Sequence, residues 1–275
     1  MLLDDWIRYF SMLYALKDVV FARSIVPEDW DRSVQPTLVT FGDGNEQAFG
    51  SVAFAIWTLL NGERDVRLIM SKAKLGPLLH KGDVIRHELG GATFSARLKT
   101  WIFGETNVKY GDSFHFLDSQ IVQAMINNKS YGFNTYAGLR LAEIENTTGP
   151  NCEEKWMHIS TKQNIADVLT KGCSPEKLGP GSIWQCGPSW LKDDIADWPV
   201  NQRKEQLSPE ESLEFKRFRK QGLPNEGSIS SIALYSLQSP KDGDSIDWSK
   251  MMFDQLMERC STLERLLNVF SFVLR

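Results

Sequence analysis

The sequence predicts an α/β domain built on a five-stranded mixed sheet with helices on its faces. Three β-rich runs follow one another, and helical segments then alternate with two further β-rich runs. Consecutive strands tend to pair as antiparallel neighbours, whereas a strand reached through a helix tends to run parallel. The chain has 275 residues, of which 42% are hydrophobic, and this is enough to bury a substantial core.

An amphipathic helix is expected at the start of the chain, over residues 1–22, where apolar side chains recur at helical spacing. Three β-rich stretches follow, with many β-branched and aromatic residues. Asn61-Gly62, between the second and the third, is a strong hairpin signal. The three strands are expected over residues 37–41, 50–59 and 66–70.

The second half of the predicted domain alternates helices with short strands. Gly90 and Gly91 fall within the first of these helices and lower its intrinsic stability. Ser119 is a suitable N-cap for the second helix, and Gly172 is a suitable end for the last. The helices are expected over residues 85–103, 119–127, 136–147 and 164–171, and the strands over 114–117 and 156–159.

The pattern changes after the last of these helices. Prolines and long polar runs predict an irregular, loosely packed extension, in which Trp184 and Trp190 pack onto the core rather than stack on bases. An amphipathic helix follows at the end of the chain. We therefore divide the chain into a connector helix and linker at 1–35, a folded domain at 36–175, an irregular C-terminal extension at 176–250 and a final helix at 251–275.

Composition narrows the classes of function. The net charge of −4 argues mildly against a free-standing nucleic-acid binder, and favours binding with the help of a neighbouring module. The chain lacks a signal-peptide pattern and an apolar stretch long enough to cross a bilayer, so we expect no membrane partner. Its cysteines lack metal-site spacing, which favours reduced thiols and an intracellular protein, cytoplasmic with nuclear location left open; they are Cys152, Cys173, Cys186 and Cys260.

Four acidic residues occupy unusual positions. Asp43 and Asp118 end predicted strands, while Glu88 and Asp167 lie on helices that could pack over those strand ends. Taken singly, each acid would be an ordinary surface residue or helix cap. Four converging carboxylates, however, would repel one another unless a cation lay between them. Oxygen ligands of this kind suit Mg²⁺ or Mn²⁺, so the joint arrangement predicts a divalent metal site.

Six short motifs occur in a definite order along the chain, and as a set they are far more specific than any one of them. They are F-G-D-G-N-E-Q-A-F-G at 41–50, S-K-A-K-L-G-P-L at 71–78, I-R-H-E-L at 85–89, L-D-S-Q-I-V at 117–122, W-M-H-I-S-T-K-Q-N-I-A-D-V-L-T-K-G at 156–172 and G-P-S-W-L at 187–191. The ordered set resembles the ribonuclease H region of BEL/Pao LTR retrotransposon polyproteins. The resemblance covers roughly residues 40–191 and implies an RNase H-like fold.

The resemblance also implies a chemistry. Two Mg²⁺ (or Mn²⁺) ions would be held by the catalytic acids, and water would hydrolyse the RNA strand of an RNA–DNA hybrid during reverse transcription, leaving 5′-phosphate and 3′-hydroxyl ends. The implied partners are the hybrid and the reverse transcriptase and integrase regions of the parent polyprotein. The implied metal ligands are Asp43, Glu88, Asp118 and Asp167.

Four further residues could act in function, and three of them also have a structural interpretation. His158 matches the histidine that many RNases H use for proton transfer, although its position in a predicted strand favours a structural role. Ser119 and Gln120 could contact the 2′-hydroxyl of RNA, while Ser119 could equally cap a helix. Asn164 could orient the substrate, or cap the last helix.

Gly42 and Gly44 depart from the family's usual pattern around Asp43, and we expect them to loosen the positioning of this acid. This departure, with the acidic net charge, supports a first alternative: a catalytically silent nucleic-acid-binding or connector domain of a decayed or domesticated element. A second alternative is a protein-interaction module that uses the final helix at 251–275 in self-association.

Overall fold

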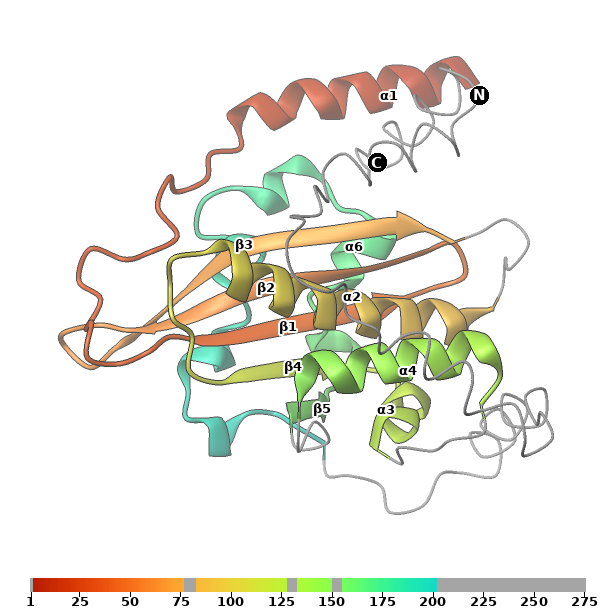
Figure 1. Cartoon of the computed structure of the whole chain (residues 1–275). Helices are drawn as coiled ribbons and strands as arrows, with labels where there is room; N and C mark the ends of the chain where they lie inside the picture. The colour runs from red at the N-terminus through yellow and green to blue at the C-terminus, as the bar shows by residue number, and fades with distance from the viewer. Residues whose placement is uncertain (1, 77–82, 128–132, 150–154, 202–275) are drawn as a thin grey trace, which may run out of the picture. The chain divides into compact units, whose positions relative to one another are not determined.

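A five-stranded mixed sheet forms the centre of the domain (Figure 1). Its strands lie in the order β3-β2-β1-β4-β5; β1 pairs antiparallel with β2 and β2 with β3, while β1 pairs parallel with β4 and β4 with β5. The predicted five-stranded mixed sheet is therefore confirmed. The strands are β1 (Thr37–Gly44), β2 (Ala48–Thr58), β3 (Arg64–Leu75), β4 (Ser113–Leu117) and β5 (Trp156–His158).

This computed structural model describes residues 2–76, 83–127, 133–149 and 155–201, all within a unit that spans Met1–Gln221. The final helix predicted at 251–275 and most of the predicted extension lie outside the described residues. The division of the chain into four parts remains a prediction.

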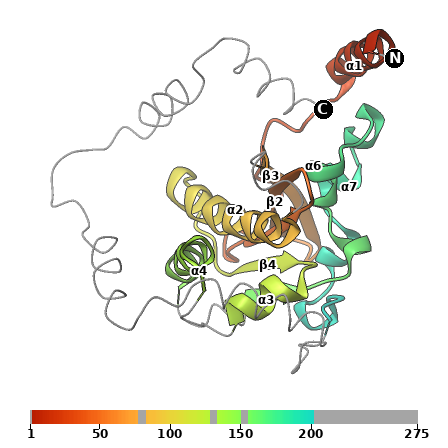
Figure 2. The same ribbon diagram turned by 90° about the vertical axis from the view of Figure 1, so that its right-hand side faces the viewer.

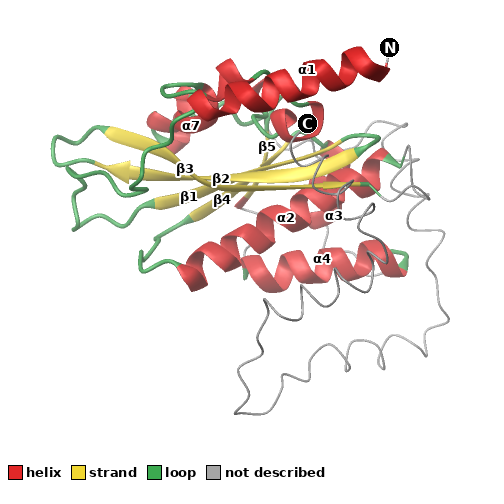
Figure 3. Ribbon diagram, turned by 90° about the horizontal axis from the view of Figure 1, so that it is seen from above, coloured by secondary structure: helices red, strands yellow, loops and turns green. Residues whose placement is uncertain are grey.

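The helices lie on both faces of the sheet. α2, α3 and α4 cover one face, and α6 and α7 lie on the other (Figures 2 and 3). The side chains of β1 alternate accordingly, since Leu38 is buried with Leu98 of α2 while Phe41 is buried with Trp184 of α7. The helices are α1 (Leu2–Ala15), α2 (Val84–Glu105), α3 (Gln120–Asn127), α4 (Thr135–Thr148), α6 (Asp167–Lys171) and α7 (Ile183–Cys186).

Two predicted helices are shorter than expected. α1 ends at Ala15 and continues only as a 3-10 turn, Leu16–Asp18. The last helix of the domain begins at Asp167 rather than at Asn164. The Asn164 side chain accepts a hydrogen bond from the backbone N–H of Ala166 (3.2 Å), and this local turn competes with helical hydrogen bonding.

The segment after α6 packs more tightly than the sequence predicts. Leu191 is fully buried, and Trp184 and Trp198 are also buried in the cluster that contains Phe41 and Phe116. The ring of Trp190 lies 5.2 Å from that of Phe116 in an edge-on arrangement. The prediction that Trp184 and Trp190 pack onto the core is confirmed, whereas loose packing is wrong for residues 176–201.

None of the helices in the described ranges combines the length and the apolar character that crossing a membrane requires. Cys173 and Cys186 are free thiols, and the other two cysteines lie outside the described residues.

Candidate metal centre

Asp43 and Asp118 meet because their strands are parallel neighbours. Asp43 lies near the end of β1, the central strand, and Asp118 directly follows β4. Gly42 is paired in register with Leu117, so the two acids leave the sheet side by side. Both strands end at the same edge, as parallel strands must, and the pairing fixes where the two carboxylates lie.

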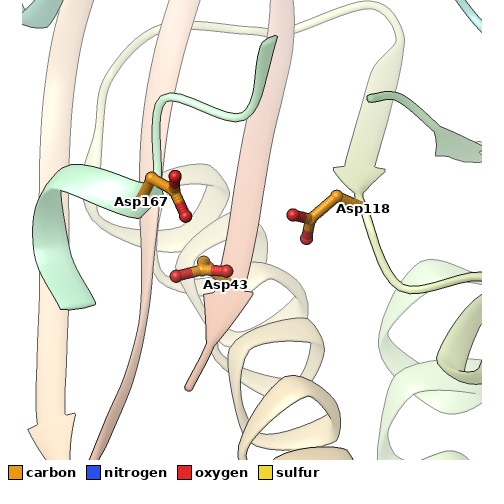
Figure 4. Close-up of side chains that lie close together, drawn as sticks. All are labelled: Asp43, Asp118 and Asp167. Atoms are coloured by element: carbon orange, nitrogen blue, oxygen red, sulfur yellow. The ribbon is translucent and has the colours of Figure 1, made fainter. Parts of the chain in front are cut away.

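Asp167 completes a group of three carboxylates. It is the first residue of α6, and its carboxylate points toward those of Asp43 and Asp118 (Figure 4). One carboxylate oxygen from each of Asp43, Asp118 and Asp167 lies within 4.8 Å of the other two. Three oxygen donors at this separation fit a hard divalent cation such as Mg²⁺ or Mn²⁺.

Glu88 lies beside this group but is not one of the three. It occupies the first turns of α2, and its carboxylate accepts a hydrogen bond from the Ser119 hydroxyl at 2.5 Å. The pKa of Glu88 is raised to about 7, chiefly by burial and also by the charges of Asp118 and Asp43, while the Ser119 hydrogen bond opposes the rise. The structure therefore gathers three of the four predicted ligands and places the fourth within electrostatic reach.

Asp43 is the buried member of the group of three. The pKa of Asp43 is raised to about 6, chiefly by burial and also by the charges of Asp118 and Asp167. The Thr170 hydroxyl, which donates to the Asp43 carboxylate, and the Lys171 charge oppose this rise. The Lys171 ammonium donates to Asp167 at 2.6 Å. A carboxylate that resists ionisation because of burial and like charges is one that a divalent cation would stabilise.

Asn164 holds the two strand ends together. Its side-chain NH₂ group donates to the backbone oxygen of Gly42 and to the Asp118 carboxylate, both at 3.0 Å. Asn164 is buried, so its amide is committed to the protein itself. It also begins the turn before α6, and the predicted role in substrate orientation remains a prediction.

His158 lies in β5, as its sequence pattern predicts. Its Nε2 lies 3.1 Å from the backbone oxygen of Asp118 and its Nδ1 lies 2.9 Å from the Asn201 amide nitrogen. Because a carbonyl oxygen only accepts, Nε2 carries the hydrogen in this contact. His158 thus stabilises the backbone position of Asp118. Its role in proton transfer remains a prediction.

Ser119 and Gln120 differ in how their polar groups are used. The Ser119 hydroxyl donates to Glu88 and accepts from the backbone N–H of Val122 at 3.3 Å, so it caps α3 and orients an acid at once. The Gln120 carboxamide oxygen is buried and has no hydrogen-bond partner within the described part of the chain.

Glycines allow α2 to pack directly against β1. The expectation that Gly42 and Gly44 loosen the positioning of Asp43 is therefore wrong. A Cβ on Gly44 would lie 2.2 Å from the backbone of His87, and a Cβ on Gly91 would lie 2.5 Å from the backbone oxygen of Asp43. Real Cβ contacts are never this close, so only glycine permits the approach. Gly42, Gly44 and Gly91 therefore set the separation between Asp43 and the helix that carries Glu88.

Residues 1–119 match the family model described as the Pao retrotransposon-like RNaseH-like domain. The family recognised from the sequence is thus confirmed for this stretch, which contains Asp43, Glu88 and Asp118, while Asp167 lies beyond it. No curated protein matches the chain.

Three solved structures resemble this chain at low identity. The N-terminal RNase H domain of a Mycobacterium tuberculosis protein, solved as a fusion with maltose-binding protein, is 10% identical, with a TM-score of 0.35; the match covers 50% of this chain and 92% of that one. RNase H1 from Halobacterium salinarum is 11% identical (TM-score 0.32, 50% and 96% covered). LC11-RNase H1, solved with an RNA/DNA hybrid, is 12% identical (TM-score 0.33, 53% and 100% covered). TM-scores this low do not establish a shared fold. The evidence for the RNase H-like fold is instead the strand order and the family model.

Three residues of the site were not predicted from the sequence. Thr170 and Lys171 follow Asp167 by three and four positions, and Asn45 follows Asp43 by two. Helical spacing from Asp167 could have indicated the first two, because residues three and four apart share a helix face.

Proposed function

We propose that this chain hydrolyses the RNA strand of RNA–DNA hybrids with the help of two divalent metal ions. The observation that supports this most is the meeting of Asp43, Asp118 and Asp167 within 4.8 Å at the ends of two parallel strands. The family model over residues 1–119 supports the same reaction class. Reverse transcription, with polymerase and integrase regions of a parent polyprotein as partners, is the expected setting.

The residues would share the work as follows. Asp43, Asp118 and Asp167 would hold the ions, and Glu88 would join them from α2. When bound, the ions supply activation of water and stabilisation of the leaving 3′ oxygen. Ser119, Asn164 and His158 hold Glu88 and Asp118 in place through the hydrogen bonds described above.

Ser119 and Asn164 are engaged within the protein, which leaves Gln120 among the three predicted substrate contacts. Its carboxamide oxygen is a buried acceptor that none of the described residues satisfies. It is two positions from Asp118, and a 2′-hydroxyl can donate to such an oxygen. A site that uses this bond would favour RNA over DNA in the cleaved strand.

The test is cleavage of labelled RNA annealed to DNA. We expect Mg²⁺-dependent cutting by the full chain, which Asp118→Asn abolishes while Asp112→Asn does not. Asp112 is a matched control because it is exposed and immediately precedes the other end of β4.

One rival function gives a different result in this assay. The net charge of −4 favours a catalytically silent domain. Such a domain would bind the hybrid without cutting it, even with Mn²⁺, and that outcome would overturn the nuclease proposal. The further alternative, self-association through the helix predicted at 251–275, concerns residues outside those described.

A further inference from the structure

α6 is too short to hold Asp167 in place by itself. It has five residues, whereas isolated helices need more than about 12 residues to be even marginally stable in water. Its position must therefore come from contacts with the rest of the domain. Val168 and Leu169 supply apolar contacts against the core cluster, and polar contacts lie at the two ends of the helix.

The polar contact at the N-terminal end comes from Asn164, which links α6 to β1 and Asp118. The contact at the C-terminal end comes from Asn45. The Asn45 side-chain NH₂ group donates to the backbone oxygen of Thr170 at 3.0 Å. This oxygen is one of the last carbonyls of the helix, which have no partner within a helix and need one from elsewhere.

Asn45 also joins two other elements. Its side-chain oxygen accepts from the backbone N–H groups of Gln47 (2.8 Å) and Ala48 (2.9 Å), which forms the turn between β1 and β2. Its backbone oxygen accepts from His87 Nδ1 at 2.5 Å, in the first turn of α2. One side chain and one carbonyl thus connect the three elements that carry Asp43, Glu88 and Asp167.

We infer that Asn45 is a positioning residue for Asp167, an inference that rests on the proposed function. Its carboxamide holds the last turn of α6 against the end of β1. Thr170, whose backbone it contacts, also donates its hydroxyl to Asp43, so displacement of this turn moves a partner of Asp43 together with Asp167. Loss of the Asn45 contact then separates Asp167 from the other two acids and weakens the binding of divalent cations.

A second asparagine in a turn, Asn61, serves to distinguish a positioning role of Asn45 from a merely structural one. Asn61 forms the turn between β2 and β3 in the same way, since its side-chain oxygen accepts from the backbone N–H of Glu63 at 2.9 Å. Its NH₂ group donates to the Glu63 carboxylate rather than to a helix. Asn61→Ala is therefore the matched control for a lost turn contact.

The first measurement is amide hydrogen exchange over residues 164–172 in the full chain. The N–H groups of Leu169 and Gly172, bonded to Ala166 and Val168 at 2.9 and 3.0 Å, report on α6. We expect Asn45→Ala to speed their exchange by about tenfold, the equivalent of one hydrogen bond. Asn45→Asp, which keeps the turn acceptor but lacks the NH₂ donor, should do the same, and Asn61→Ala should leave both amides unchanged.

The second measurement is the affinity for Mn²⁺ alone. We expect Asn45→Ala to weaken it by roughly three- to tenfold, and to have no further effect in an Asp167→Asn background, because residues that act through one another are not additive. Unchanged exchange in both Asn45 variants, or full additivity with Asp167→Asn, would overturn the inference. If the wild-type chain binds no Mn²⁺, the proposed function fails, while the exchange measurement still decides whether Asn45 positions α6.

Discussion

The strand-borne and the helix-borne acids of this domain are held in different ways. Asp43 and Asp118 take their positions from backbone pairing along β1 and β4, in which every residue of the register contributes. Asp167 takes its position from a five-residue helix, and side-chain hydrogen bonds at each end of this helix connect it to the rest of the domain. Backbone ladders tolerate the loss of any one side chain, whereas such a helix depends on particular ones. The two halves of the site should therefore respond differently to mutation.

The largest expected effect comes from replacing a strand-borne acid or the helix-borne acid itself. Asp43 interacts electrostatically with Asp118, Asp167, Glu88 and Lys171, whereas the Asp167 carboxylate forms an ion pair with Lys171. We expect Asp43→Asn to slow hybrid cleavage by about 100-fold or more, and Asp167→Asn by about tenfold with a higher Mg²⁺ requirement. Single-turnover rates across a Mg²⁺ titration measure both. Equal losses in the two variants would show that the helix-borne acid is as central as the strand-borne one.

A second prediction concerns a substitution that displaces α2, the helix that carries Glu88. Gly91→Ala places a Cβ against the backbone of Asp43, so it should lower the free energy of unfolding by about 1–3 kcal/mol and also weaken Mn²⁺ binding. Gly104→Ala is the control in the same helix, because a Cβ there meets nothing within 4 Å. It should be neutral or stabilise by up to about 1 kcal/mol. Urea unfolding of both variants gives the comparison, and equal stability of the two would remove the role assigned to Gly91.

The smallest effect concerns pH. The folded-state pKa values of Asp43 and Glu88, about 6 and about 7, lie above the ordinary values of 3.8 and 4.5. The folded protein therefore holds protons that the unfolded chain has lost, and this stabilisation disappears as the pH rises through 6 to 7. Excess Mg²⁺ should replace it, so we expect the rise in Tm on adding Mg²⁺ to be larger at about pH 8 than at about pH 5, by about 2–5 °C.

Glu88→Gln is the control for this pH dependence. His115 contributes in the opposite sense, because burial lowers its pKa to about 3 and its contribution is lost as the pH falls below 6.5. Glu88→Gln leaves His115 unchanged, so calorimetry of the variant against the wild type isolates the carboxylate. A Tm difference between the two proteins that does not change with pH would contradict the raised pKa of Glu88.

Much of the site could be predicted because its acids mark the ends of recognisable elements. Asp43 and Asp118 follow apolar strand patterns, and strands that end together bring their next residues together. The prediction about the glycines failed for an identifiable reason. Flexibility is a property of an isolated chain, whereas Gly44 and Gly91 lie where two backbones touch, and no local pattern reveals such a contact.

The hydrogen bonds that hold α6 in position could not be predicted from the sequence either. Asn45 and Thr170 are separated by 125 positions, and Asn164 and Gly42 by 122. Hydrogen bonds of this range leave no periodicity in the sequence, since each needs one side chain at one place. Apart from Trp184 and Trp190, the close packing of residues 176–201 was missed for a related reason, because Leu191 and Trp198 are too far apart to form a strand or helix pattern.

The sequence by itself predicted the elements and the mixed sheet and indicated the family and the candidate acids, because hydrophobic periodicity and ordered motifs are local properties. The tertiary structure alone decided which acids meet, how far Glu88 lies from the other three, and which neutral side chains hold α6. Those depend on distances of a few ångströms between residues that are up to 125 positions apart, and such distances arise only when the two faces of the sheet have packed.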